Sequence, residues 1–294
     1  MTKRGLALFA AMAFIWGIPY LLIRIAVREL DPGVLVFGRT VPAAIIMLTL
    51  VAYKKQFPIM IANIKWILIF AVIEFGIPWY LMGTSEKHLT SSITSLLICC
   101  VPLFSVLGQL IRRTEHEKIS QRRIFGLAIG IIGVAFLVGI DVRGGSIGWV
   151  ALLLIVCVGY TIGPIILATK LNGVPGSIVI AGSSAFVAVC WTPWTLTHWP
   201  AHISGETWAC VGTLSIVCTA IAFVVFGALI AEIGATRSTV ITYINTAVAV
   251  VLGVVFLNEP LTAGILVGFP LVLMGSIYAT SSKAATATAV ETHS

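Results

Sequence analysis

Residues 148–168 read GWVALLLIVCVGYTIGPIILA, a run of 21 residues without a charged side chain. An α-helix rises about 1.5 Å per residue, so this run is long enough to cross a bilayer hydrocarbon core about 30 Å thick. Nine more apolar runs of similar length lie at residues 5–27, 33–53, 66–83, 89–111, 124–140, 178–197, 207–231, 236–257 and 263–280. The sequence therefore predicts an all-α integral membrane protein with ten transmembrane helices, because helices satisfy their own backbone hydrogen bonds in lipid.

The composition excludes several other classes of protein. Of the 294 residues, 59% are hydrophobic and 10% are charged, and the mean hydropathy of +1.07 is far above that of a water-soluble enzyme. The apolar runs lack the alternating pattern of a transmembrane β-barrel. The net charge of +7 comes without a basic stripe interleaved with aromatic residues, so we expect the lipid bilayer as a partner and no nucleic acid.

The distribution of basic residues predicts the orientation of the chain, because lysine and arginine are retained preferentially in cytoplasmic loops. Along the ten predicted spans, 13 of the 18 lysine and arginine residues fall on the side of both termini. The opposite loops carry only Arg28, Lys87 and Arg143. We therefore expect a multi-pass protein of the plasma (inner) membrane with both termini in the cytoplasm.

The C-terminal parts of the two halves repeat with a shift of 142 residues. The matched blocks are Glu117-Lys-Ile-Ser120 with Gly126 and Gly133, and Glu259-Pro-Leu-Thr262 with Gly268 and Gly275. Each half contains five spans, and this odd number makes the second half enter the membrane in the opposite orientation. We expect two inverted five-span repeats, residues 1–140 and 141–280, as in many secondary transporters, and a disordered cytoplasmic tail at residues 281–294.

These residues make the sequence resemble the EamA family of the drug/metabolite transporter (DMT) superfamily, whose ten-span members consist of two five-span units. The resemblance covers about residues 5–280. It rests on Trp16-Gly17 in the first span, Arg39 in the second, Pro102 in the fourth and the two Glu-x-(Leu/Ile)-(Ser/Thr) blocks. The second half departs from the pattern, because Tyr160-Thr161 replaces Trp-Gly and Ala247 stands where a proline is expected.

The resemblance implies a secondary exporter of small metabolites, and the deep aromatic residues make it similar to the aromatic amino-acid exporter branch. Alternating access around a central, aromatic-lined cavity is the implied mechanism. The implied partner is a small-molecule solute, either an amino acid or an aromatic cation. A monomer is the expected form.

Three charged side chains lie well within the predicted spans, namely Arg24, Arg39 and Glu74. A charge at the centre of a transmembrane helix costs about 2.5–3.5 kcal/mol on insertion scales, so each should face protein or water. Glu74 is a candidate for coupling or gating, by binding protons or attracting an ammonium group. A structural ion pair with Arg39, or solvation beside a cavity, would explain Glu74 equally well. Arg39 is a second coupling or gating candidate, whereas Arg24 is expected to extend to the lipid headgroups.

Aromatic residues deep in the spans form the candidate solute site, because the headgroup belt explains only rings near span ends. Trp16 and Tyr20 lie four residues apart and hence on one helix face. Such rings would bind an apolar or aromatic side chain or attract a cation, and helix packing would also explain any single ring. The substrate-binding candidates are Trp16, Tyr20, Trp79, Tyr80, Tyr160, Tyr243 and Asn245. The Asn245 amide would also suit a hydrogen bond between helices.

Prolines and glycines interrupt several spans. A proline inside a helix removes a backbone hydrogen bond and bends the helix, so Pro19, Pro102 and Pro164 are candidate hinges. Glycine pairs spaced by four residues are Gly126/Gly130, Gly159/Gly163 and Gly264/Gly268. Such pairs permit close helix approach, which we expect within one molecule rather than between two copies.

The remaining reactive residue types indicate no enzyme. All six cysteines lie within spans without the paired spacing of metal ligands, so we expect them to pack as small apolar side chains. The five histidines lie in loops or tails, and the sequence has no Gly-x4-Gly-Lys-(Ser/Thr) loop for ATP. We therefore expect no catalytic residue, no metal and no cofactor.

Two classes of function suit a polytopic membrane protein of this composition. Secondary transport of a small amphipathic solute, favouring aromatic or neutral amino acids, is the first. Within it, efflux of aromatic or quaternary-ammonium cations is the alternative, because ring faces and Glu74 would also suit a permanent positive charge. The second class, a membrane enzyme acting on lipid-linked substrates, would need acids, histidines or lysines gathered at one membrane face, which the short loops do not supply.

The predicted topology places both ends of the chain on the same, cytoplasmic side of the membrane. In a cysteine-free background, Thr2→Cys and Ser294→Cys should resist a membrane-impermeant maleimide in intact cells and react after permeabilisation. His202→Cys, in a predicted outer loop, should react without permeabilisation. Labelling of one terminus alone in intact cells would contradict an even number of spans.

Overall fold

The computed structural model describes residues 2–111, 121–141, 146–233 and 241–280, and each regular element in these ranges is a helix. In the first half the helices are α1 (Lys3–Ala26), α2 (Pro32–Tyr53), α3 (Phe57–Ala62), α4 (Ile64–Phe70), the π-helix η1 (Ala71–Gly76), α5 (Ile77–Glu86), α6 (Ser91–Ile98), α7 (Val101–Ile111) and α8 (Gln121–Asp141). In the second half they are α9 (Ile147–Thr169), α10 (Gly176–His198), α11 (Gly205–Ser215), the π-helix η3 (Ile216–Ile221), α12 (Ala222–Ile233), α14 (Ile241–Leu257) and α15 (Ala263–Thr280). The block at 117–120 and the predicted tail at 281–294 lie outside the described residues.

Within the described ranges, seven helices are long and apolar enough to cross a bilayer. They are Lys3–Ala26, Pro32–Tyr53, Ile64–Glu86, Ser91–Gly108, Ile147–Thr169, Gly176–His198 and Gly205–Ile233. Shorter apolar helices at Ile124–Ile140, Ile241–Leu257 and Ala263–Tyr278 occupy three further predicted spans. The all-α integral membrane fold is confirmed, and crossing by the three shorter helices stays a prediction.

Three predicted spans differ from a single continuous α-helix. The eighth, predicted at 207–231, contains the π-helix η3 between α11 and α12. The third, predicted at 66–83, continues to Glu86 and contains the π-helix η1. The fourth, predicted as one helix at 89–111, is divided at Cys99 and Cys100 into α6 and α7. Pro102 explains this division, because it has no backbone N–H and its ring clashes with the preceding turn of a straight helix.

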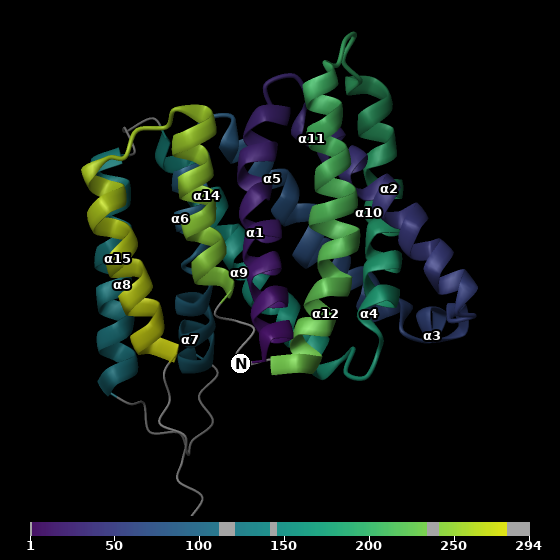
Figure 1. Ribbon diagram of the computed structural model, residues 1–294, viewed down its shortest axis with the longest axis horizontal. Coiled ribbons are helices and arrows are strands. Elements are labelled where there is room, and N and C mark those ends of the chain that lie inside the picture. Colours follow the sequence, from purple (N-terminus) through teal and green to yellow (C-terminus); the bar gives the residue numbers. More distant parts are fainter. Residues whose placement is uncertain (1, 112–120, 142–145, 234–240, 281–294) are drawn as a thin grey trace, which may run out of the picture.

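The helices stand side by side as a bundle with two ends (Figure 1). We call the end that holds the first residues of α1 the near end. Because α1 finishes at Ala26 and α2 starts at Pro32, the opposite end holds the α1–α2 connection, and we call it the far end. The charge distribution predicts that the far end faces the outside.

The repeated glycines form the contact between α8 and α15, which lie beside each other in Figure 1. A Cβ atom on Gly275 would lie 2.6 Å from Gly130 Cα and 2.7 Å from the Gly126 carbonyl oxygen. A Cβ atom on Gly133 would lie 2.7 Å from the Val272 backbone nitrogen. The 142-residue shift takes Gly130 to Val272 and Gly133 to Gly275, so it converts one of these contacts into the other. Along the contact, residue numbers increase on α8 and decrease on α15. The helices therefore run antiparallel in a contact related to itself by a two-fold axis.

The six cysteines mostly pack as small apolar side chains, as expected. Five are buried, whereas Cys190 is exposed on the flank of α10. Buried side chains of α1, α12 and α14 form a separate cluster with Met12, Leu229 and Ile241 at its centre. This cluster lies toward the near end, because Met12 belongs to the first half of α1 and Leu229 to the last turns of α12.

The glycine contact between α8 and α15 predicts that two glycine-to-alanine substitutions will differ strongly in their effect on stability. Gly275→Ala should lower the free energy of unfolding by about 1–3 kcal/mol, because its Cβ meets backbone atoms that cannot rotate away. Gly139→Ala on α8 is the matched control, since its Cβ meets no atom within 4 Å and should leave stability unchanged or raised. Denaturant titration of both variants in detergent measures the difference. Equal stabilities would show that α8 and α15 do not make this contact.

Candidate functional site

Arg39 on α2 points into the bundle and is only 6% exposed. Its Nε donates a hydrogen bond of 3.2 Å to Thr219 Oγ1 on η3, and its guanidinium carbon lies 3.6 Å from the centre of the Trp79 ring. The structure records no hydrogen bond from its two Nη groups to any described residue. Arg39 therefore does not extend to the headgroups, and most of its donors are available for a ligand.

A series of aromatic rings leads from Arg39 toward α1. Trp79 stacks on Phe75 with 4.3 Å between ring centres, Phe75 lies 6.0 Å from Phe223, and Phe223 lies 5.9 Å from Trp16. Trp16 also contacts Phe226, with 4.7 Å between the centres. We call Trp79, Phe75, Phe223 and Trp16 the aromatic series. It joins α5, η1, α12 and α1 and so connects the two halves of the chain.

Tyr160 on α9 lies near Arg39 and Glu74. It lies close enough to Arg39, Glu74 and Trp79 to interact with each of them. Tyr20 on α1 interacts in turn with Tyr160 and with Arg39. Two of the four tyrosines that were predicted as solute ligands, Tyr20 and Tyr160, therefore belong to the same cluster as Arg39.

Glu74 belongs to η1 and lies against the glycine face of α9. A Cβ atom on Gly163 would lie 2.8 Å from Glu74 Cδ, and one on Gly159 would lie 2.5 Å from the Ile73 carbonyl oxygen. The Gly159/Gly163 pair thus brings α9 against η1 within one molecule, as expected. One Glu74 carboxyl oxygen is buried without a hydrogen-bond partner, and these described side chains form no Glu74–Arg39 ion pair. The ion-pair explanation of Glu74 is therefore wrong for this structure.

The two π-helices occupy equivalent positions in the two halves. Residues 71–76 of η1 and 216–221 of η3 are related by 145 residues, the shift that also relates Pro19 to Pro164. Glu74 and Thr219 consequently hold the same position in their π-helices. Widened turns of this kind occur often at functional sites. Sequence analysis missed Thr219, although the 145-residue shift from Glu74 would have identified it.

The division of the fourth span lies beside α9. The Thr161 hydroxyl donates a 3.4 Å hydrogen bond to the Val101 carbonyl oxygen, and the Cys157 thiol donates one of 3.3 Å to the Leu97 carbonyl oxygen. Discontinuous helices line the midplane sites of many secondary transporters. Pro102 follows the division, whereas Pro19 and Pro164 lie inside α1 and α9. Their role as hinges stays a prediction.

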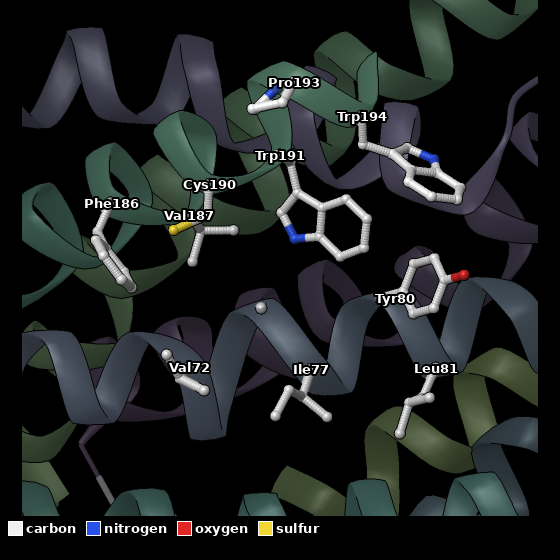
Figure 2. A pocket seen from close by; sticks show the side chains of 11 residues that line it. Val72, Ile77, Tyr80, Leu81, Phe186, Val187, Cys190, Trp191, Pro193 and Trp194 are labelled. Atoms are coloured by element: carbon white, nitrogen blue, oxygen red, sulfur yellow. The ribbon is translucent and has the colours of Figure 1, made fainter. Parts of the chain in front are cut away.

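Tyr80 lies away from the cluster and lines a pocket on the flank of the bundle. Its ring stacks on Trp191 with 4.7 Å between the centres. The pocket has a volume of about 620 Å³. Side chains of η1, α5 and α10 line it, as Figure 2 shows. A second pocket, lined by residues of α4, η1 and α10, lies on the same flank. Neither pocket is lined by Trp16, Tyr20 or Tyr160, so the predicted central cavity stays a prediction.

Asn245 and Tyr243 lie on α14, where Asn245 faces α1. A Cβ atom on Gly17 would lie 2.9 Å from the Asn245 carbonyl oxygen, and Thr246 Oγ1 donates a 3.4 Å hydrogen bond to Asn245 Oδ1. This placement favours a role in helix packing for Asn245. Tyr243 packs against the main apolar core.

Arg24, expected to extend to the headgroups, instead meets protein. Its Nη1 donates to the backbone carbonyl oxygen of Glu86. The side chain is half-buried at the far end of α1. Arg24 thus belongs to the contact between α1 and α5.

Two stretches of the chain, residues 3–139 and 147–281, each match the EamA-like transporter family. The inner membrane transporter YedA of Escherichia coli (strain K12) is 26% identical over 259 residues, covering 84% of this chain and 80% of YedA. A Streptantibioticus cattleyicolor protein named "Probable terminal-alkyne amino-acid exporter" is 29% identical over 192 residues, covering 61% of this chain and 60% of that protein. These relatives do not single out the aromatic amino-acid exporter branch, which stays a prediction.

A protein known from a crystal structure has a similar fold, with a TM-score of 0.62 and 16% identity over 95% of this chain and 97% of its own. At this identity the likeness concerns the fold alone. The two family matches span most of the 294 residues, and the described chain is a bundle of apolar helices. The chain therefore belongs to the EamA-like transporter family and is a multi-pass integral membrane protein.

Proposed function

We propose that this protein is a secondary transporter that exports amino acids, with Arg39, Tyr160 and Glu74 at its solute site. The observation that carries the proposal is the pair of opposite charges, Arg39 and Glu74, which lie inside the bundle without pairing with each other. Both interact electrostatically with Tyr160 and so belong to the same cluster.

An amino acid supplies the two groups that these side chains lack. The Arg39 guanidinium presents a planar set of N–H donors that matches a carboxylate. Glu74 presents a buried carboxyl oxygen that would accept a hydrogen bond from an ammonium group. Each charge of the solute would therefore compensate a group that is costly to leave unpaired away from water.

The aromatic series would receive the solute side chain. Trp79 already contacts Arg39, and Phe75, Phe223 and Trp16 continue from it. Such rings favour apolar and aromatic side chains over charged ones. The relative named as a terminal-alkyne amino-acid exporter supports an amino acid as solute and export as the direction.

Alternating access requires that each end of the bundle open in turn. At the near end, Met12, Leu229 and Ile241 are almost fully buried, and Thr2 donates a 2.5 Å hydrogen bond to Glu232 on α12. The self-related contact of α8 with α15 supports two inverted repeats, residues 1–140 and 141–280, that move against each other. Widened turns, the divided fourth span and Pro19 and Pro164 supply the positions at which the helices would bend.

The competing function is efflux of aromatic or quaternary-ammonium cations. Glu74 and the ring faces would suit such a cation, but Arg39 contacts the same rings and would repel it. The buried guanidinium therefore favours a solute with a carboxylate.

Removal of the Arg39 charge should discriminate between these solutes. In proteoliposomes, Arg39→Gln should weaken competition by phenylalanine in counterflow about thirtyfold or more, because loss of one partner of a buried charge pair costs about 2–5 kcal/mol. Competition by phenethylamine, which lacks the carboxylate, should be retained. Arg28→Gln, which removes an exposed charge, is the control. Equal competition by phenylalanine in both variants would exclude Arg39 from carboxylate binding.

Removal of the Glu74 charge should weaken binding of solutes with an ammonium group and spare a solute that carries only a carboxylate. Glu74→Gln should weaken competition by phenylalanine and by phenethylamine, because both carry an ammonium group that would lose its partner. N-acetylphenylalanine, which keeps only the carboxylate, should compete equally well in both forms of the protein. Glu206→Gln, an exposed acid on α11, is the matched control. Unchanged phenylalanine competition in Glu74→Gln would remove Glu74 from the solute site.

A further inference from the structure

Glu86 is a buried acid that the proposed transport site does not use. It is the last residue of α5, near the far end of the bundle, and its side chain is 0% exposed. Both carboxyl oxygens are buried without a hydrogen-bond partner. Sequence analysis missed Glu86, because the third predicted span ended at residue 83.

The groups that act on Glu86 come from two neighbouring elements. From α1, Arg24 donates to the Glu86 backbone carbonyl oxygen and acts on the Glu86 side chain as an opposite charge, and Tyr20 also interacts with that side chain. From the segment between α14 and α15, Glu259 interacts with it as a like charge. In the described chain, α2, α6, α9 and η1 also pack against α5, but their charged groups, Arg39 on α2 and Glu74 on η1, are not among those that act on Glu86.

Glu259 fastens the start of α6 to the second half of the chain. Its Oε1 accepts hydrogen bonds from Ser91 N at 2.8 Å and Ser91 Oγ at 3.0 Å, and its Oε2 accepts them from Ser92 N at 3.0 Å and Ser92 Oγ at 2.5 Å. The packing is close, because a Cβ atom on Gly253 would lie 2.5 Å from Glu259 Oε2. We call Ser91, Ser92 and Glu259 the far-end latch.

The closed far-end latch favours an ionised Glu259 together with a neutral Glu86. Four donors at a helix N-terminus are the partners that an ionised carboxylate prefers, so the latch suits a negative Glu259. An ionised Glu86 would place a second negative charge near Glu259, with no hydrogen bond to its own carboxyl oxygens and with Arg24, which already donates to the Glu86 backbone, as the described counter-charge. Its burial would then cost far more than that of a protonated carboxyl group. The closed latch is therefore compatible with a protonated Glu86.

A line of ionisable side chains connects Glu86 with the solute site. Glu74 interacts with Tyr160, Tyr160 with Tyr20, and Tyr20 with Glu86. These four side chains belong to η1, α9, α1 and α5. A change of charge at Glu86 would therefore act on the latch through Glu259 and on the centre through the two tyrosines.

We propose that Glu86 is a proton-binding site that controls the far end of the transporter. With the proton bound, Glu86 is neutral and the latch between Glu259 and the start of α6 is closed. When the proton leaves, the Glu86 carboxylate repels Glu259 and draws water, and the latch opens. The proton is released to the solvent at the far end, and no other bond is made or broken.

The test measures how pH changes access to the latch. Leu89, next to the latch, is 4% exposed, so Leu89→Cys in a cysteine-free background should react with a maleimide only when the far end opens. The measured quantity is the labelling rate of Leu89→Cys in the purified, full-length protein divided by the rate of the exposed His202→Cys. This ratio should rise from pH 6 to 9 by up to about tenfold per pH unit. Glu86→Gln should make this ratio low and independent of pH, since the amide is always neutral.

Three further variants separate Glu86 from other acids. Glu86→Asp should keep the pH response with a shifted midpoint, which tests the proposal if the glutamine variant does not fold. Glu259→Gln should give fast labelling at every pH. Glu29→Gln should leave the response unchanged, because the Ser204 backbone N–H, donating at 2.9 Å, lowers the pKa of Glu29 and keeps this exposed far-end carboxyl ionised throughout the range.

Two results would overturn the proposal. The first is an unchanged pH response in Glu86→Gln. The second is loss of the response in Glu74→Gln with Glu86 intact, which would place the controlling proton at the centre. Neither result depends on which solute is carried, so the labelling is independent of the proposed amino-acid transport.

Discussion

The cost of leaving a polar group unpaired away from water governs the arrangement of this protein. Many hydroxyl groups in its helices avoid that cost locally; Thr40, Thr49, Thr84 and Thr246, for example, donate to carbonyl oxygens of their own helices. Charged side chains have no such local solution, because their helix offers them no counter-charge. The few that lie inside the bundle with free donors or acceptors therefore indicate where a solute or a proton is expected to bind.

Close helix packing brings these groups together. Glycines allow α9 to lie against η1 and α1 against α14, so side chains from both halves reach one another. The two π-helices add a widened turn at equivalent positions, but they carry different residues, Glu74 in η1 and Thr219 in η3. The repeat thus supplies similar backbones, and the two halves carry different side chains at this equivalent position. One half presents an acid, while the other holds Arg39 through a hydroxyl group.

Glu74 and Glu86 have different surroundings, which suit them to different roles. Glu74 faces the glycine surface of α9 and Tyr160, within reach of the central arginine. Glu86 lies beside the latch, where Glu259 joins the second half to the start of α6. A central group suits recognition of the solute, and a peripheral group suits control of access. Tyr20 and Tyr160 interact electrostatically with them and with each other, so the two events would be coupled through these side chains.

The sequence by itself determined the helical membrane fold and the family, because length, hydropathy and matched spacing are properties of the chain alone. It also identified Trp16, Tyr20, Arg39, Glu74 and Tyr160 as candidates. Only the tertiary structure decided their partners: Arg39 meets Trp79 and Thr219 rather than Glu74, Tyr80 turns to the flank, and Glu86 is buried. Partners depend on how each helix is rotated, widened or divided, and neighbouring helices fix those features through contacts that no local pattern contains.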